Sequence, residues 1–331
     1  MNVLFIGGTG LISTEVSRLA LAKGINLTLL NRGNHKDALP RGVKTITADI
    51  KDEDDVKTLI ATLTFDVVVD WVAFTEADVM RDYRLFKGKT TQYIFISSAS
   101  AYQKPLPTVP ITERIPLGNP FWQYSQHKKR CEDTLRNLRD PAFHVTIIRP
   151  AHTYNERSIV FQVQPWDHPF TLIRRILDKR PIVIPDDGKT RWTLTHNRDF
   201  AKGFLDLLGN EAAYDDTFHL TSDKVYTWND LAMSVYAALD EKPNVIHMPS
   251  DIILRHFPEL KGPMLGDNLH HSVYDNSKIK AIAPHYASTI DYTNVVARAV
   301  KHYLDNPDNQ TVNHSFLARY DRMVEAYLAR K

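Results

Sequence analysis

Short apolar runs alternate with helical patterns over the first half of this chain, and this alternation limits the possible folds most strongly. The runs have four to six residues and are rich in Val, Ile, Leu and Phe, as is typical of strands buried on both faces of a parallel sheet. The runs are Val3–Ile6, Leu27–Leu30, Val43–Thr47, Val67–Val72, Tyr93–Ile96 and Val145–Ile148. The helical patterns between them are Leu11–Lys23, Asp52–Leu63, Ala77–Phe86 and Tyr124–Leu138. Strand, helix and strand in repetition predict a doubly wound parallel α/β sheet.

A glycine-rich turn, "VLFIGGTGLIS" (Val3–Ser13), joins the first run to the first helical pattern. A strand that ends in glycines and leads into a helix presents the amides of the helix's first turn to an anion. Gly7 and Gly8 permit the tight turn, and Gly10 removes a side chain where a pyrophosphate must come close. Ser13 replaces the third glycine of the usual spacing. The position of the turn predicts a Rossmann-type dinucleotide site.

The end of the second run bears on the choice of cofactor. An NAD site usually has an acid there that accepts hydrogen bonds from the ribose 2′-hydroxyl, whereas this chain has Asn31 followed by Arg32. A guanidinium would pair with a 2′-phosphate, so NADP is preferred over NAD, and the alternative is a solvated loop charge. Asp49 and Ile50 follow the third run and are predicted to meet the adenine ring. The alternative for Asp49 is a helix N-cap.

Three residues are candidates for catalysis. Ser98 ends the fifth run, and Tyr124 and Lys128 stand four apart in "FWQYSQHKKRCEDTL", on one face of a predicted helix. A phenol that acts as a base near pH 7 needs its pKa lowered by about three, or roughly 4 kcal/mol, which an ammonium and a positive nicotinamide ring can supply. Tyr124 would then exchange a proton with a substrate hydroxyl during hydride transfer, while Ser98 bonds the reacting oxygen and Lys128 holds the ribose. The alternative is a chance spacing.

After Pro150 the alternation ends. "QVQPWDHPFTLIRRILDKRPIVIPDDGK" has clustered prolines and irregular polar stretches, and Asn294–Tyr303 and Phe316–Leu328 are expected closing helices. We expect a dinucleotide-binding domain over residues 1–150 and a smaller, mainly substrate-binding lobe over residues 151–331. Some segments of the second part are expected to return to the sheet.

Composition excludes several classes of protein. The single cysteine, Cys131, rules out an internal disulfide and is expected to be a packed helix residue. No histidine spacing suits a metal, so none is expected. A net charge of +2 does not favour nucleic acid or an anionic membrane as a partner. No window approaches eighteen consecutive apolar residues and the chain begins without a leader, which predicts a cytoplasmic protein.

Seven motifs together carry a resemblance to a known family: "GGTGLIS", "ADI", "SSASAY", "YSQHK", "RPAHTYN", "HNRDFA" in the later lobe, and "DNSK". The chain resembles an extended short-chain dehydrogenase/reductase, the superfamily that contains the NAD(P)-dependent nucleotide-sugar epimerases and dehydratases. The resemblance implies a catalytic triad of Ser98, Tyr124 and Lys128. The expected cofactor contacts are Gly7, Gly10, Leu11, Ile12, Asn31, Arg32, Asp49, Ile50, Ala73, Tyr124 and Lys128.

Departures from the family narrow the prediction. Dehydratases have an Asp-Glu pair after the catalytic Ser or Thr, and Ala99 and Ser100 stand there, so dehydration is disfavoured. Epimerases have an arginine four residues before the histidine of "H-x-x-D". Trp192 holds that place and Arg191 is one residue early, which leaves nucleotide-diphosphate recognition open. The short span after Ala73 resembles the atypical branch that includes chloroplast stem-loop RNA-binding proteins, and either a monomer or a homodimer is expected.

Two functional hypotheses remain. The first is an NAD(P)-dependent oxidoreductase or epimerase that acts on a hydroxyl or carbonyl of a sugar-like or nucleotide-sugar-like small molecule, with Tyr124 as acid and base. The second is a catalytically silent cofactor-binding protein with a regulatory or RNA-binding role. Candidate substrate contacts are Ser100, Tyr102, His152 and Arg191, and ordinary packing is the alternative for Tyr102 and His152.

Overall fold

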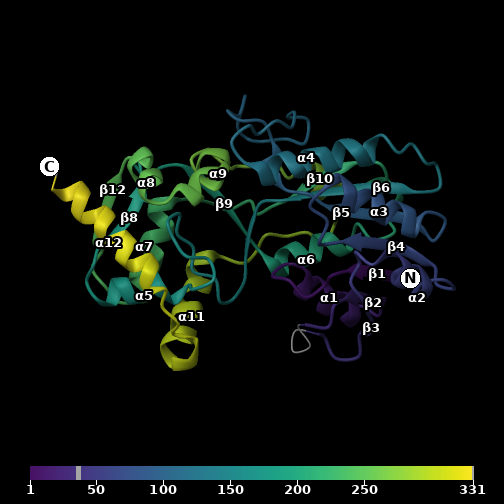
Figure 1. Cartoon of the computed structure of the whole chain (residues 1–331), viewed down its shortest axis with the longest axis horizontal. Helices are drawn as coiled ribbons and strands as arrows, with labels where there is room; N and C mark the ends of the chain where they lie inside the picture. Colours follow the sequence, from purple (N-terminus) through teal and green to yellow (C-terminus); the bar gives the residue numbers. More distant parts are fainter. Residues whose placement is uncertain (35–38, 330–331) are drawn as a thin grey trace. The chain divides into compact units, whose positions relative to one another are not determined.

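A computed structural model of the protein describes residues 1–34 and 39–329, and it contains the predicted sheet. Seven parallel strands follow the order β10-β6-β5-β4-β1-β2-β3 (Figure 1). They are β1 (Asn2–Ile6), β2 (Asn26–Asn31), β3 (Lys44–Thr47), β4 (Phe65–Asp70), β5 (Thr90–Ile96), β6 (His144–Pro150) and β10 (Thr217–Leu220). The order reverses between β1 and β4, and sheets of this kind bind ligands beyond the carboxyl ends of their strands at such a point. The predicted doubly wound α/β fold is therefore confirmed.

Helices cover both faces of this sheet. Side chains of β1 alternate between two buried clusters: Val3 and Phe5 pack with α1 and α6, whereas Leu4 and Ile6 pack with α2, α3 and α4. The helices are α1 (Ser13–Ala22), α2 (Glu53–Leu59), α3 (Glu76–Phe86), α4 (Gln123–Arg136), α6 (Asn197–Leu205) and α10 (Ser277–Ile282), with short turns η2 (Ala99–Ala101) and η3 (Glu211–Ala213). Burial of both faces explains why the strands are continuously apolar.

Several predicted elements end later in the chain than the observed ones, among them β4 and α2. Strand β4 ends at Asp70 instead of Val72, because the Asp70 carboxylate accepts the amides of Val72 and Ala73 and turns the chain away from the sheet. Helix α2 ends at Leu59 instead of Leu63. The N-cap of α2 is Asp52, which accepts from the Asp55 amide, so the alternative that made Asp49 the cap is wrong.

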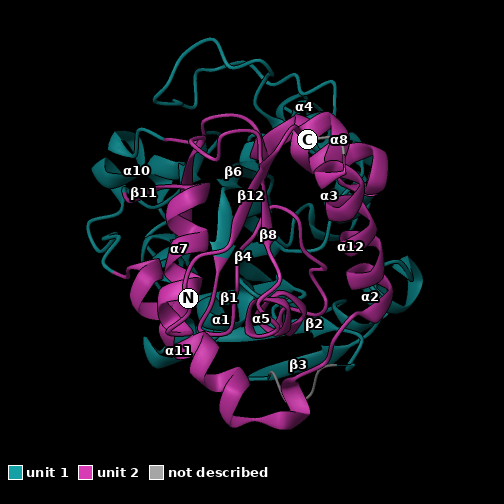
Figure 2. Ribbon diagram, turned by 90° about the vertical axis from the view of Figure 1, so that its left-hand side faces the viewer, with its two compact units in different colours: residues 1–153, 195–223, 274–289 teal, residues 154–194, 224–273, 290–331 magenta. Residues whose placement is uncertain are grey.

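The chain divides into two compact units (Figure 2). Unit 1 comprises Met1–Thr153, Thr195–Asp223 and Tyr274–Thr289, and unit 2 comprises Tyr154–Leu194, Lys224–Val273 and Ile290–Lys331, of which the last two residues are not described. The "HNRDFA" motif, expected in the later lobe, lies in unit 1, where His196 ends β9 and the rest of the motif begins α6. Two strands, β7 (His152–Tyr154) and β9 (Arg191–His196), contain points where the chain passes from one unit to the other.

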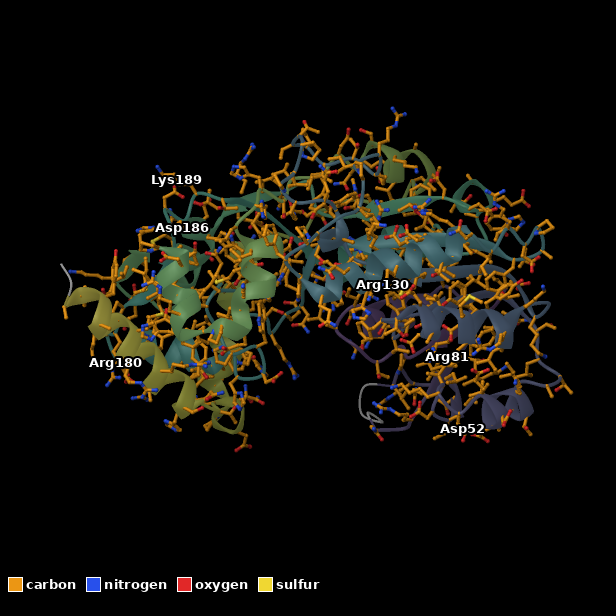
Figure 3. The ribbon with its side chains drawn as sticks, turned by 45° about the horizontal axis from the view of Figure 1, so that its top comes forward. Asp52, Arg81, Arg130, Arg180, Asp186 and Lys189 are labelled. Atoms are coloured by element: carbon orange, nitrogen blue, oxygen red, sulfur yellow. The ribbon has the colours of Figure 1, made fainter. Side chains whose placement is uncertain are left out.

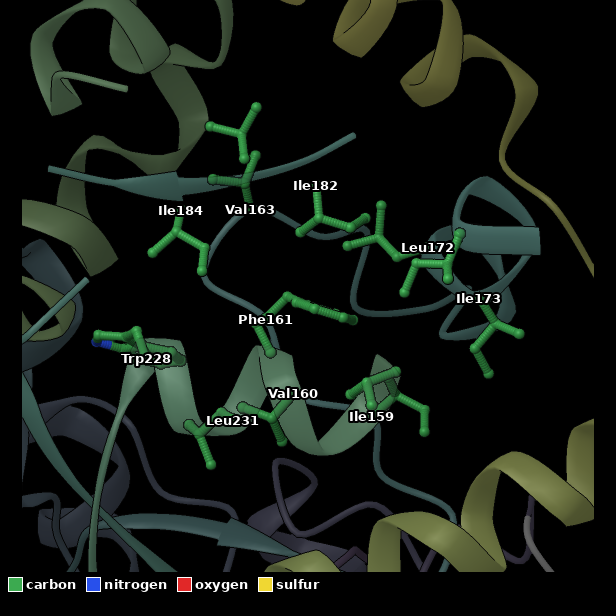
Figure 4. Packing of buried hydrophobic residues seen from close by; sticks show 14 of the residues in the cluster. Ile159, Val160, Phe161, Val163, Leu172, Ile173, Ile182, Ile184, Trp228 and Leu231 are labelled. Atoms are coloured by element: carbon green, nitrogen blue, oxygen red, sulfur yellow. The ribbon is translucent and has the colours of Figure 1, made fainter. Parts of the chain in front are cut away.

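Unit 2 is built around one apolar core. Figure 4 shows Ile159, Phe161, Ile182, Ile184 and Trp228 in this core. Strand β8 (Ile182–Pro185) pairs with β12 (Val245–Met248), and β11 (Val225–Thr227) pairs antiparallel with β9. Its helices are α5 (Phe170–Leu177), α7 (Trp228–Ala238), α8 (Ser250–His256), α9 (Lys261–Pro263), α11 (Tyr292–Asp305) and α12 (His314–Leu328), with short turns η4 (Pro258–Leu260), η5 (Met264–Asn268) and η6 (Pro307–Asn309). The two predicted closing helices are confirmed within α11 and α12. No helix in the described part of the chain has both the length and the apolar character needed to cross a membrane.

Candidate active site

The turn between β1 and α1 contains three glycines, and its backbone conformation requires two of them. Gly7 and Gly8 have φ values of 97° and 98°, which favour glycine. A Cβ at Gly8 would lie 2.7 Å from a methyl carbon of Leu29. Among the described residues, a Cβ at Gly10 would meet only the Ser13 Oγ, at 3.5 Å, so none of these neighbours requires that glycine. Open space therefore adjoins Gly10 at the start of α1, whose N-cap residue, Ile12, makes no side-chain capping bond.

Two polar side chains hold this turn in place. The Ser13 Oγ accepts from the Gly10 amide at 2.9 Å, so the residue that replaces the third glycine bonds the loop as well as being small. Asn197 of α6 donates from its side-chain amide to the Leu11 carbonyl at 2.9 Å. The sequence analysis missed this role of Asn197, although it had singled out the "HNRDFA" motif.

A cavity of about 890 Å³ in unit 1 runs from this turn along the carboxyl ends of the strands. Most predicted cofactor and catalytic residues line it: Gly7, Gly10, Leu11, Ile12, Asn31, Arg32, Asp49, Ile50, Ser98, Tyr124 and Lys128. Ala73 is buried and does not line the cavity, but its carbonyl oxygen accepts a hydrogen bond from the Lys128 ammonium. The fold therefore gathers these lining residues from five separate parts of the sequence.

At one end of this cavity lie Asn31 and Arg32. The Asn31 Oδ1 accepts from the Gly33 amide at 2.9 Å, while its Nδ2 is buried and has no partner among the described residues. Arg32 is exposed, and no carboxylate in ranges 1–34 and 39–329 pairs with it. Lys51 also lines this end, and the sequence analysis did not identify it although it stands two residues after Asp49. The end thus offers two cations and an unsatisfied amide donor.

The other end carries the candidate catalytic hydroxyls. The Ser98 Oγ lies 2.9 Å from the Ser100 Oγ, which lies 2.7 Å from the Ser125 Oγ, so a chain of hydroxyls links the end of β5 to α4. The Tyr124 ring is flanked by Trp122 and Phe74, with ring centroids 5.0 Å and 6.1 Å away. Ser100 is buried in this chain and does not line the cavity, so it stands behind Ser98.

Lys128 is buried, and its ammonium bonds to backbone oxygens. Its Nζ donates to the carbonyls of Ala73 at 2.7 Å and Ile96 at 2.8 Å, and it lies 5.8 Å from the centre of the Tyr124 ring. Burial lowers the pKa of Lys128 to about 8, because a charge loses its hydration there. The residue is therefore still largely protonated at neutral pH, and its charge lies close to the Tyr124 ring.

The remaining candidate substrate contacts are less well placed. Tyr102 is fully buried and does not line the cavity, and its hydroxyl lies 3.2 Å from the His219 Nδ1. Tyr102 is therefore a packed core residue, which was the alternative to a substrate contact. His152 does not line the cavity, although its neighbours Ala151 and Thr153 do, and burial lowers the pKa of His152 to about 4. Arg191 belongs to unit 2, where it is exposed and its backbone amide donates to the His271 Nδ1.

Two further sequence positions prove to be core positions. Trp192 is 1% exposed and packs against Trp228 with ring centroids 5.0 Å apart, so it fills the core of unit 2. Cys131 is fully buried, and burial raises the pKa of its thiol to about 12, which confirms the expected packed residue. No group of three or more His, Cys, Asp or Glu side chains within the described ranges is arranged to hold a metal ion.

A seven-stranded parallel sheet with a glycine turn and a cavity at its reversal point defines a Rossmann-type nucleotide-binding protein. The model of the NAD-dependent epimerase/dehydratase family matches residues 3–84 and 77–218. The chain belongs to this family, as the resemblance in its motifs predicted.

The proteins that this chain is similar to differ in what their names describe. A chloroplast stem-loop binding protein of 41 kDa from Arabidopsis thaliana is 30% identical over 260 residues, which cover 74% of this chain and 65% of that protein. A 2′-dehydrokanamycin reductase from Streptomyces kanamyceticus is 26% identical over 252 residues, covering 76% and 70% of the two chains. The solved UDP-glucose 4-epimerase of Bifidobacterium longum, in complex with NAD+ and UDP, has a TM-score of 0.71 and 18% sequence identity to this chain. The match covers 94% of this chain and 100% of that chain. This structural likeness shows the fold.

Proposed function

We propose that the protein is an NADP(H)-dependent oxidoreductase or epimerase that acts at a hydroxyl or carbonyl carbon of a sugar-like small molecule. One observation carries the proposal: Ser98, Tyr124 and Lys128 line the same cavity as the glycine turn. The cofactor supplies hydride acceptance or donation when bound. Unit 2 is the proposed substrate-binding lobe, and Arg191 remains a candidate contact within it.

The residues that line the cavity suit a dinucleotide. The space beside Gly10 would be narrowed by any side chain, and the uncapped start of α1 favours a negative group there. Arg32, Lys51 and the unsatisfied Asn31 Nδ2 would hold a phosphorylated ribose, which supports NADP over NAD. Ile50 would pack against an adenine ring, and Asp49 would bond its polar edge.

Each side chain at the reacting end has a definite task in this proposal. Ser98 donates a hydrogen bond to the reacting oxygen and is itself held by Ser100. Tyr124 takes a proton from a hydroxyl, or returns it to the oxygen of a carbonyl, at its phenolic oxygen. The Lys128 charge favours the phenolate, because an opposite charge a few ångströms away stabilises it.

The 30% identity to a stem-loop binding protein supports a second candidate function, in which the protein binds RNA without turnover. A balanced net charge of +2 gives no general affinity for phosphates, so such binding would need a specific patch. The catalytic set favours the enzyme, since a binding protein has no need of Ser98, Tyr124 and Lys128 on one cavity wall.

Fluorescence titration with NADPH and NADH, followed by a turnover screen, tests these candidates. The screen contains free sugars, nucleotide sugars and aminoglycosides, the last because one relative is named as a dehydrokanamycin reductase. We expect tighter binding of NADPH and cofactor turnover with at least one class. Cofactor binding without turnover, together with saturable binding of a stem-loop RNA, would favour the second function. Binding of neither cofactor contradicts both.

A further inference from the structure

We propose that Asp70 is a positioning residue of this site: its carboxylate fixes the turn after β4 and provides the buried counter-charge for the Lys128 ammonium. The proposal rests on the proposed function, since it assigns Lys128 the role described above. It concerns a residue that does not line the cavity and that no motif in the sequence singled out.

Asp70 and Lys128 are linked through the backbone of one residue, Ala73. Asp70 is fully buried, and its Oδ1 accepts from the Val72 amide at 2.5 Å and from the Ala73 amide at 2.8 Å. The Ala73 carbonyl in turn accepts from the Lys128 Nζ at 2.7 Å. The carboxylate thus orients the residue that receives the ammonium. Ile96, at the end of β5, is the other acceptor of Lys128.

The other cation near Asp70 is already committed to different partners. Arg81, labelled in Figure 3, donates to Asp82 at 2.9 Å and 2.7 Å and to Asp78 at 2.9 Å. It lies 3.9 Å from the Asp70 Oδ2, which also receives a long hydrogen bond of 3.4 Å from the Tyr93 hydroxyl. Burial and the Asp70 charge raise the pKa of Asp82. Among the three carboxylates around Arg81, Asp70 is therefore the most distant.

Several titratable groups face Lys128, and Asp70 differs from each. On α4 itself, Glu132 is bound to Arg149 at 2.9 Å and 2.6 Å, and burial keeps the Cys131 thiol neutral. Asp78, at the start of α3, is held by Arg81 and by the helix cap at Thr75. The fourth group, Tyr124, is the one that Lys128 is proposed to acidify.

Removal of the Asp70 charge should therefore discharge Lys128. Burial alone lowers the Lys128 pKa, and the carboxylates oppose this, Asp70 most strongly. Without Asp70 the pKa falls further, so a larger fraction of Lys128 is deprotonated at neutral pH, and in that fraction the phenol loses its neighbouring charge. In this proposal, Asp70 determines the highest pH at which Lys128 stays protonated and the site stays active.

The experiment titrates Lys128 in Asp70→Asn by NMR of its side-chain nitrogen. Asparagine keeps an oxygen that accepts from the two amides, and it removes the charge together with the oxygen that accepts from the Tyr93 hydroxyl. We expect the Lys128 pKa to fall by about one, and the alkaline limb of turnover to move down by the same amount. The control is Asp133→Asn on the outer side of α4, where the carboxylate is 51% exposed and pairs with Lys129, and it should leave Lys128 unchanged. Unchanged titration of Lys128 in Asp70→Asn overturns the proposal.

The Lys128 resonance can be followed without a substrate. The result therefore tests the role of Asp70 separately from the proposed enzymatic function. A shifted Lys128 pKa in a protein that turns over no substrate supports the counter-charge and removes the proposed enzymatic function. If Asp70→Asn does not fold, the wild-type protein provides the test. The carboxyl carbon resonance of Asp70 should then respond as Lys128 loses its proton near pH 8, and a silent Asp70 resonance overturns the proposal.

Discussion

The glycine turn and the Lys128 pocket lie in the same cavity but are built on opposite principles. The turn consists of neighbouring residues, and it works by leaving out side chains at Gly7, Gly8 and Gly10. The pocket brings together the ends of β4 and β5 and one face of α4, and it works by burying a charge among oriented dipoles. Local backbone conformation therefore determines one end of the site, and long-range electrostatics determines the other.

The largest expected effect is a loss of turnover in a variant of the pocket. Cofactor binding, which we assign to the glycine turn, should stay nearly unchanged in this variant. Tyr124→Phe removes only the phenolic oxygen, so we expect turnover to fall about a thousandfold while the Kd for NADPH changes little. Steady-state kinetics and fluorescence titration measure the two. Tyr83→Phe is the control, because its hydroxyl bonds Asp140 and does not line the cavity. Full activity in Tyr124→Phe would remove this residue from the mechanism.

Buried charge in the pocket should also appear as a pH dependence of stability. The pKa of Lys128 is about 8 in the folded protein and about 10.4 in an unfolded chain, so the unfolded chain binds more protons between these values. The contribution of Lys128 to the free energy of unfolding therefore rises with pH, by about 2 kcal/mol between pH 7.5 and pH 10. Lys128→Met should lack this rise, and denaturant unfolding at both pH values measures it.

The matched control for that measurement is Lys129→Met. Lys129 is 39% exposed and pairs with Asp133, so its replacement should leave the pH dependence of unfolding as it is in the wild type. An equal pH dependence in Lys128→Met and wild type would show that Lys128 titrates normally.

Within the turn, two glycines should respond differently to the same substitution. Gly8→Ala places a methyl group 2.7 Å from Leu29 at a positive φ, so we expect a loss of about 2 kcal/mol in the free energy of unfolding. Gly10→Ala meets no such neighbour and should change stability by less than about 0.5 kcal/mol. Its effect should instead be an NADPH affinity lowered by about tenfold. Equal stability losses in the two variants would contradict this distinction.

The smallest expected effect concerns cofactor preference. Arg32→Ala should lower the affinity for NADPH by about tenfold and leave that for NADH unchanged, because only NADPH has a 2′-phosphate to pair with the guanidinium. Fluorescence titration of both cofactors measures this. Arg41→Ala, which removes an exposed charge outside the cavity lining, serves as the control. An equal loss for both cofactors would assign Arg32 to general electrostatics.

Sequence reasoning succeeded where a local pattern fixes the backbone. The continuous apolar runs identified six strands of the sheet, and the spacing of Tyr124 and Lys128 placed both on one helix, α4. Both residues line the cavity. It failed where burial depends on distant segments. Tyr102 is adjacent in sequence to the candidate catalytic segment, yet it packs against His219 from a strand more than a hundred residues away.

By itself, the sequence determined the parallel sheet, the glycine turn and the family, because strand and helix periodicities and turn chemistry act over a few residues. Only the tertiary structure decided that Ala73 receives the Lys128 ammonium and that Asp70 lies behind it. The position of a charge relative to its partners depends on how separate strands end at one edge of a sheet. No spacing within a single segment contains that information.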